Sequence, residues 1–399
     1  MSAQRRVALL IDTHGGWGRD IVRGIGAFLR DNDVSWQITH ESRMVDNRVP
    51  RWLARWRGDG VIAKMRVKGT QAFLQRLQIP AVDVVNSCEN PSFPVVAVDD
   101  RAIAETAFQH LHDRGFRAFA FVGGYGRIWE TARRDAFAAA AKARDCRCDV
   151  FEFKEHANYP SPEGQCLRRL ARWLAGLQTP LGVMGACDYF GRLALSGLET
   201  AGIPVPERAG VIGADDDDTL CAIANPPLSS VITNHATVGY EAARLLEMLM
   251  SGQQKIRGPH SAMSITVPPL GVAVRRSTEM LAVPDPDVSR ALAIIRDESA
   301  AKLTIEQVAD RLAISRTTLA RHFRRAVGHG VHEEILRVRM QKAQTLLAES
   351  ELPIRVVAKR TGFEHQEYMG RLFRSRLGTT PKQYRDQARR RILPGPAST

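Results

Sequence analysis

Hydrophobic and polar positions alternate on two length scales over the first 280 residues. Short apolar runs such as 5–12 (RRVALLID), 117–124 (RAFAFVGG) and 181–188 (LGVMGACD) have the length of buried strands. Longer segments with apolar residues three or four positions apart, such as 19–33 (RDIVRGIGAFLRDND), are typical of amphipathic helices. Strands alternating with helices predict an α/β fold with parallel sheets. Because the pattern restarts after Asp99, we expect two lobes around a cleft.

Polar side chains follow four of these predicted strands, at the edge where parallel sheets bind ligands. We expect the ligand to contact Asp12, Trp17, Trp129, Arg133, Asp188 and Asp215. Carboxylates and arginine bond pairs of hydroxyl groups, and tryptophan faces stack on sugar rings. The set therefore predicts a small polyhydroxylated ligand. A single aspartate at such a position is also a common helix N-cap, so the prediction depends on the four strand ends together.

The last third of the chain contains a repeat. Segments 317–331 (TTLARHFRRAVGHGV) and 367–381 (EYMGRLFRSRLGTTP) align at an offset of fifty residues. Each follows a shorter amphipathic segment and a tight turn, which predicts two helix-turn-helix units at about 304–328 and 353–378. The segment 332–350 between them has helical periodicity, and such a helix would be about 28 Å long. That length can place two recognition helices about one DNA turn, roughly 34 Å, apart.

The distribution of charge supports a nucleic-acid partner for this last third. The net charge of the whole chain is +13. Residues 285–399 carry 22 Lys and Arg against 13 Asp and Glu, whereas the preceding 284 residues carry 34 against 30. A localised positive charge is the expected electrostatic signature of DNA binding.

Residues 5–275 resemble the sensor domain of the LacI/GalR repressors. The resemblance lies in 211–218 (VIGADDDD), 225–231 (NPPLSSV) and 238–252 (VGYEAARLLEMLMSG). It implies that Arg133 and Asp215 touch a sugar, and it places Asp188 at the acidic position of an Asn-Asp pair. The Asn of that pair is Cys187 here. Since the first strand begins near residue 5, we expect the sensor to act on a DNA-binding part other than the N-terminal one of that family.

The last hundred residues resemble the AraC/XylS DNA-binding domain. The family signature is matched by Ala358, Gly362, Phe363, Phe373, Arg374, Gly378, Thr380, Pro381, Tyr384 and Arg385. The resemblance implies two sets of groove-facing positions, Arg316, Thr317, Ala320 and Arg321 in the first copy and Gln366, Glu367, Gly370 and Arg371 in the second. Arg can pair with guanine and Gln with adenine, while Arg324 and Arg374 are expected to hold phosphates.

Together these features predict a sugar-sensing domain at 1–280, a linker at 281–290 and an all-α DNA-binding domain at 291–392. This order is similar to that of pentose-responsive activators within the AraC/XylS family. The resemblance implies D-xylose or a related pentose as effector, double-stranded operator DNA and RNA polymerase as partners, and a homodimer. Another sugar or a sugar acid as effector, and repression in place of activation, remain as alternatives.

The sequence gives little support to catalysis. The first strand is not followed by G-x-G-x-x-G, and no P-loop, G-x-S-x-G or H-E-x-x-H occurs. The six cysteines lack metal-ligand spacing, and no apolar run approaches the roughly 20 residues of a membrane helix. We therefore expect a cytoplasmic regulator that is not an enzyme and has no cofactor, metal or membrane partner.

Overall fold

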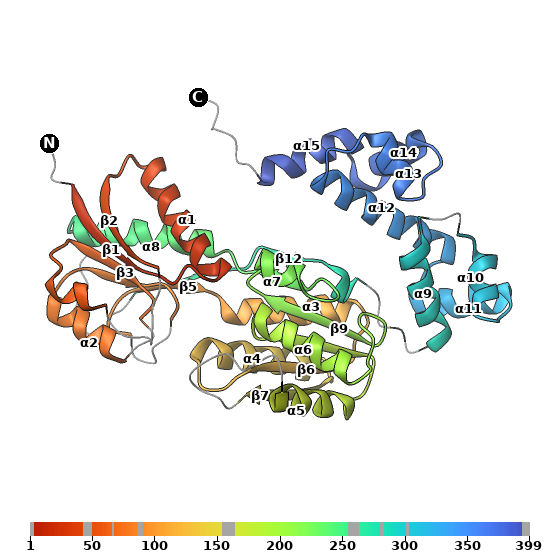
Figure 1. Cartoon of the computed structure of the whole chain (residues 1–399), viewed down its shortest axis with the longest axis horizontal. Helices are drawn as coiled ribbons and strands as arrows, with labels where there is room; N and C mark the ends of the chain where they lie inside the picture. The colour runs from red at the N-terminus through yellow and green to blue at the C-terminus, as the bar shows by residue number, and fades with distance from the viewer. Residues whose placement is uncertain are drawn as a thin grey trace. The chain divides into compact units, whose positions relative to one another are not determined.

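The structure, a computed structural model, describes residues 4–42, 50–65, 68–86, 91–153, 164–253, 263–279, 283, 285–300 and 303–392 (Figure 1). The chain divides into two compact units, Met1–Met280 and Leu281–Thr399. No helix in the described ranges is long and apolar enough to cross a membrane.

The first lobe of the N-terminal unit is a six-stranded parallel sheet with the order β11-β5-β4-β3-β1-β2. Its strands are β1 (Arg5–Leu10), β2 (Trp36–Glu41), β3 (Gly60–Ala63), β4 (Ala81–Asp83), β5 (Val95–Val98) and β11 (Ser264–Val267). Its helices are α1 (Gly16–Asp31), α2 (Lys68–Leu77), α8 (His235–Met250) and the short 3-10 helix η2 (Arg51–Arg55). Alternate residues of β1 point to opposite faces, so Val7 and Leu9 pack with α1 and α8, whereas Leu10 packs with Leu74 of α2.

The second lobe repeats this architecture, with the strand order β12-β10-β9-β8-β6-β7 and an antiparallel β12 at one edge. Its strands are β6 (Ala118–Gly124), β7 (Arg147–Phe153), β8 (Leu181–Gly185), β9 (Ala209–Ala214), β10 (Ser229–Ile232) and β12 (Gly271–Ala273). Its helices are α3 (Asp100–Asp113), α4 (Ile128–Lys142), α5 (Gly164–Ala175), α6 (Asp188–Thr200) and α7 (Asp218–Ala222). The predicted two-lobed α/β fold is confirmed.

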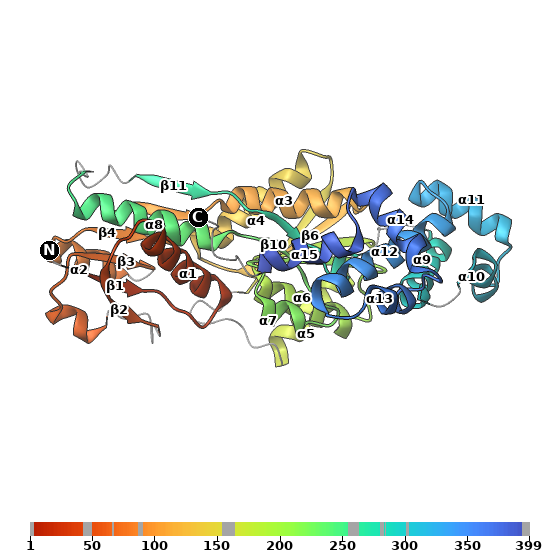
Figure 2. The same ribbon diagram turned by 90° about the horizontal axis from the view of Figure 1, so that it is seen from above.

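The two lobes are not simply successive halves of the unit. After β10 the chain returns to the first lobe as α8, which lies along α1 (Figures 1 and 2), and as β11, which pairs with β5. It then crosses back as β12 and the 3-10 helix η3 (Arg276–Thr278). Ser277 Oγ donates to Val211 O at 2.6 Å, and Thr278 Oγ1 donates to Ser229 Oγ at 2.7 Å. The last segment of the sensor is therefore anchored to the second lobe.

All the regular secondary structure in the described residues of the C-terminal unit is helical. Its helices are α9 (Pro286–Glu298), α10 (Ile305–Arg311), α11 (Arg316–Val327), α12 (Val331–Glu349), α13 (Ile354–Arg360), α14 (Gln366–Leu377) and α15 (Pro381–Ile392). The pairs α10–α11 and α13–α14 form the two expected helix-turn-helix units, and α12 connects them. Helix α9 begins inside the expected linker 281–290, because Asp285 caps it and Pro286 occupies its first turn. Linker residues 281, 282 and 284 lie outside the described ranges.

The two helix-turn-helix units share their turn geometry. Ala313 and Gly362, at matching positions of the repeat, have φ values of 54° and 84°. Both residues have a left-handed backbone conformation, and this conformation turns the chain after the first helix of each pair. The phenyl rings of Phe323 and Phe373, also equivalent, are fully buried. The repeat seen in the sequence is thus a structural repeat.

Candidate functional site

A cavity of about 530 Å³, its open mouth included, lies between the two lobes at the carboxyl ends of the strands. It is lined by Trp17, Lys64, Val84, Val85, Ala97, Val98, Asp100, Trp129, Arg133, Asp215 and His235. Four of the six residues predicted to contact the ligand are among them, namely Trp17, Trp129, Arg133 and Asp215. Segments that follow strands of both lobes therefore meet around one shared cavity.

Arg133 of α4 is the most constrained charged residue of the cavity. Its Nε donates to Asp100 Oδ1 at 2.8 Å and its Nη1 donates to Ala186 O at 2.7 Å. The Nη1 atom also lies 3.5 Å from Asp215 Oδ1. Burial would lower the pKa of Arg133, but Asp100 and Asp215 outweigh burial and raise it. The guanidinium is thus a fixed, permanently charged donor at the wall of the cavity.

Asp215 is held in an uncommon backbone conformation beside Arg133. Its φ is 105°, outside the regions that residues with a side chain usually adopt. Burial raises the pKa of Asp215 to about 6, although Arg133 opposes that shift. A strained, half-buried carboxylate next to an arginine is a feature that clusters at ligand sites.

Apolar and aromatic side chains complete the cavity. Trp129, one helical turn before Arg133, lies with its ring 4.9 Å from the guanidinium carbon. On the first lobe the Lys64 ammonium lies 4.5 Å from the ring centroid of Trp17. Val84, Val85 and Val98 contribute an apolar part of the cavity wall. Two aromatic faces, an apolar wall and a few fixed polar groups suit a small ring with hydroxyl groups.

Asp12 and Asp188, the other two predicted contacts, do not line the cavity. The Asp12 carboxylate is partly exposed and accepts from the backbone nitrogen and Nδ1 of His14 at 3.0 and 2.9 Å. The Asp188 carboxylate is buried behind the wall, where it accepts from Ser230 Oγ at 2.6 Å and from the backbone nitrogen of Asp217 at 2.7 Å. Burial raises the pKa of Asp188 well above its ordinary value. Asp188 thus supports the loop that carries Asp215.

The sequence reasoning missed three polar residues of the cavity. Asp100 follows β5, a four-residue strand that was not predicted, so its position at a strand end went unnoticed. Lys64 follows β3 directly, and that strand end was visible in the sequence. His235 begins α8, whose return to the first lobe brings it to the cavity. Burial and Arg133 lower the pKa of His235 to about 3, so its ring is neutral.

The residues predicted to face DNA lie on the open surface of the second helix of each pair. Nine of the ten are exposed, and Gly370 is half-buried. Ser315 caps α11 by accepting from Thr318 N at 3.0 Å, which fixes the start of the first of these helices. The arginines at equivalent positions, Arg321 and Arg371, are exposed just before the buried Phe323 and Phe373.

The two recognition helices differ in charge. Helix α11 carries four arginines and no acidic residue, whereas α14 carries three arginines and Glu367. Arg316 at the start of α11 pairs with Glu306 of α10 at 2.8 Å, and both side chains are exposed. In α14 the Arg371 guanidinium carbon lies 5.7 Å from the ring centroid of Tyr368. The first helix is therefore the stronger match for phosphates, and the second presents a more mixed surface.

Comparison with known proteins matches every part of this arrangement. Residues 6–101 match the XylR N-terminal domain, residues 108–278 a periplasmic binding protein-like domain and residues 308–387 a helix-turn-helix domain. The xylose operon regulatory protein of Escherichia coli strain K12 is 32% identical over 392 residues, covering 96% of this chain and 97% of that protein. Its counterpart in Haemophilus influenzae is 29% identical, covering 95% of this chain and 98% of that protein.

A solved structure of a xylose-binding transcription activator, XylR, has the same overall organisation. It superposes with a TM-score of 0.75 at 31% sequence identity, covering 97% of this chain and 99% of that one. The similarity thus extends over both units and not over one domain alone.

Proposed function

This chain belongs to the family of the xylose operon regulatory proteins, and from that premise we propose that it activates transcription in response to D-xylose. The observation that carries the proposal is the cavity that Arg133, fixed beside Asp100 and Asp215, lines together with Trp17 and Trp129. The guanidinium and Asp215 bond the sugar hydroxyls, while Trp17 and Trp129 cover its ring. Asp12 and Asp188 act as supports outside the cavity. Binding, without catalysis, is the role of this site.

The C-terminal unit carries the output of the switch. Arg321 and Arg371 enter successive major grooves of operator DNA, and Arg324 and Arg374 hold phosphates. The active form is a cytoplasmic homodimer that recruits RNA polymerase. Sedimentation of the full chain with operator DNA, with and without D-xylose, tests the dimer, and a reporter fused to the operator tests activation against repression.

Thermal unfolding of the full chain with a panel of sugars tests the effector. The panel contains D-xylose, L-arabinose, D-ribose and D-glucose, and a ligand at a hundred times its dissociation constant stabilises by about 2.7 kcal/mol. We expect D-xylose to raise the midpoint most, and Asp215→Ala to abolish that rise. Asp113→Ala, the same change at an exposed position of the second lobe, is the control that keeps it. No shift with any of the sugars would contradict D-xylose as effector.

A sugar acid is the second candidate effector, because the cavity is lined by a second cationic side chain, Lys64, in addition to Arg133. A carboxylate on the sugar would bond that ammonium in a partly water-excluded site. Adding D-xylonate and D-glucuronate to the panel separates the two ligand classes. A shift with an acid that is lost in Lys64→Met, and no shift with D-xylose, would favour the sugar acid.

A further inference from the structure

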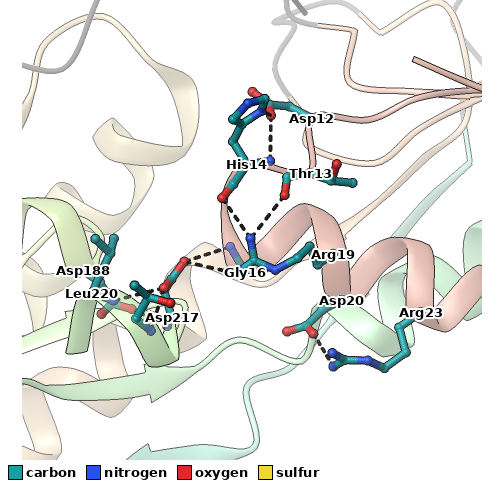
Figure 3. A network of polar contacts seen from close by, with 11 residues as sticks. Asp12, Thr13, His14, Gly16, Arg19, Asp20, Arg23, Asp188, Asp217 and Leu220 are labelled. Carbon is teal, nitrogen blue, oxygen red and sulfur yellow. Dashed lines mark hydrogen bonds and ion pairs between the residues drawn. The ribbon is translucent and has the colours of Figure 1, made fainter. Parts of the chain in front are cut away.

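Four consecutive aspartates, 215–218, connect β9 to the start of α7 in the second lobe, and one of them, Asp217, contacts the first lobe (Figure 3). Asp217 Oδ2 accepts a hydrogen bond from the backbone nitrogen of Gly16, the first residue of α1, at 2.8 Å. Its Oδ1 accepts from the backbone nitrogens of Thr219 and Leu220, both at 3.1 Å. One carboxylate therefore caps α7 in its own lobe and binds the start of α1 in the other.

Both ends of this contact are held in place. The backbone nitrogen of Asp217 donates to the buried carboxylate of Asp188 at 2.7 Å. On the other side, Arg19 lies 4.0 Å from Asp217 Oδ2, and its Nη1 donates to Thr13 O and His14 O at 3.2 and 2.9 Å (Figure 3). Asp217 itself is 8% exposed. A partly desolvated carboxylate that accepts backbone hydrogen bonds at a helix N-terminus is a strong interaction.

The contact adjoins the cavity, because the residue after Gly16 is Trp17. We propose that Asp217 is a positioning residue. Its hydrogen bond with Gly16, which we call the latch, holds the two lobes together and fixes Trp17 against the bound effector. The latch favours the closed cleft in the absence of the effector. Because the apparent affinity for the effector scales with the fraction of molecules that are already closed, the latch raises that affinity. The affinity part of this inference rests on the proposed function, whereas the latch itself does not.

Like charges also lie near the latch. Burial raises the pKa of Asp20 of α1, Arg23 and Arg19 lower it, and the charges of Asp218 and Asp216 of the second lobe raise it. Arg23 Nη1 lies 2.5 Å from Asp20 Oδ1 and partly neutralises it. Because these like charges do not hold the lobes together, removing the charge of Asp218 should not open the cleft, in contrast to removing that of Asp217.

Two variants break the latch from opposite sides. In Asp217→Asn a single side-chain oxygen remains, so it can cap α7 or accept from Gly16 but cannot do both. In Gly16→Pro the donor nitrogen loses its hydrogen, and the proline ring displaces the Asp217 carboxylate from α1, because a Cβ at residue 16 would already lie 3.0 Å from Asp217 Oδ2. Proline is tolerated at the first position of a helix, and the extended backbone of Gly15, with φ −87° and ψ 158°, is compatible with a following proline. Asp218→Asn is the matched control.

The measurement is the interlobe distance in the full chain without effector, from energy transfer between dyes carried by unnatural amino acids at Gln75 of α2 and Ala175 of α5. Both positions are exposed, and they lie in different lobes. We expect a shifted and broader distance distribution in Asp217→Asn and in Gly16→Pro, no further change when the two are combined, and no opening in Asp218→Asn. Unchanged distributions in both single variants, or additive shifts, would overturn the latch.

Effector affinity is the second readout. We expect D-xylose binding to weaken about tenfold in both latch variants, as for the loss of one hydrogen bond to a charged group, and to stay equal or tighten in Asp218→Asn. Opened distributions with unchanged affinity would overturn the link between the latch and Trp17. If wild-type protein binds no D-xylose, the proposed effector fails, while the distance measurement still decides the latch.

Discussion

At the scale of single residues, Asp215 combines a cost in stability with a role in binding. Its carboxylate is half-buried, with a pKa that burial raises, and its φ of 105° is unfavourable. Asparagine tolerates positive φ and carries no charge. We therefore expect Asp215→Asn to raise the free energy of unfolding by about 1 kcal/mol at pH 7 and to weaken D-xylose binding at least tenfold.

Chemical unfolding and titration calorimetry of the full chain measure the two effects. Asp100→Asn is the informative comparison, because it removes the partner of Arg133 Nε at 2.8 Å. Breaking a buried pair leaves an uncompensated charge, so this variant should lose about 3 kcal/mol. Destabilisation of equal size in both variants would show that Asp215 is an ordinary partner of Arg133.

The same carboxylate predicts how binding depends on pH. The pKa of Asp215 is raised to about 6 in the folded protein, so the folded state binds this proton more tightly than the unfolded state. The destabilisation due to Asp215 is therefore relieved progressively as the pH falls from about 6 toward 3.8, the ordinary pKa of the group. Effector binding has the opposite dependence, because it uses the ionised carboxylate.

Since about one tenth of a group with a pKa of 6 is ionised at pH 5, D-xylose affinity should fall about tenfold between pH 7 and pH 5. Asp100, whose pKa burial also raises, acts in the same direction. His235, with its pKa lowered to about 3, stays neutral in this window. Calorimetry at four pH values checks the trend, and an affinity that does not change with pH would contradict an ionised Asp215 at the sugar.

The strand ends that can be recognised in the sequence indicated which residues lie near the cavity, whereas the contacts of these residues with a ligand stay a prediction. Trp129, Arg133 and Asp215 line the cavity as their strand ends indicated, whereas Asp188 also follows a strand and points behind the wall. A strand end fixes where the backbone is but not the direction of the side chain, which depends on partners such as Ser230 that lie far away in sequence.

At the scale of elements, the two turns of the repeat allow a matched experiment. Ala313 and Gly362 are both left-handed, but only Ala313 carries a side chain that this conformation disfavours. We expect Ala313→Gly to stabilise the first helix-turn-helix unit by about 0.5–1 kcal/mol, and Gly362→Ala to destabilise the second by about 2 kcal/mol. A Cβ at residue 362 would also lie 2.5 Å from Ser299 O.

Amide hydrogen exchange in α10–α11 and in α13–α14 of the full chain measures the local stability of each helix-turn-helix unit separately. Opposite changes in protection, each confined to its own unit, are the expected outcome. Slower exchange in α13–α14 of Gly362→Ala would contradict the structural equivalence of the two turns.

Most elements could be predicted from local pattern alone. Thr304 and Gln307 form a capping box, a signature visible in the local sequence, at the start of α10, and α12 has nineteen residues, like the predicted helical segment 332–350. Strands β10, β11 and β12 were not identified, because they have only three or four residues and their burial comes from distant elements. Whether α8 covers the first or the second lobe depends on packing against α1, which no local window contains.

At the scale of the whole molecule, two recognition helices in one chain should contribute separately to DNA affinity. Arg321→Ala and Arg371→Ala each remove one candidate base contact, and each should cost about 1–3 kcal/mol and relax specificity in its own half of the site. Arg324→Ala and Arg374→Ala remove phosphate contacts, so they should weaken binding to all sequences and reduce the slope of log affinity against log salt by about one.

Operator titrations of the full chain at several salt concentrations, with footprinting of each variant, separate the loss of a base contact from the loss of a phosphate contact. Because α11 carries more positive charge than α14 and no acidic residue, we expect the first-copy variants to lose more affinity at low salt. A footprint and salt slope that Arg371→Ala and Arg374→Ala both leave unchanged would mean that the second helix does not enter the DNA, and that α12 positions α14 for a different contact.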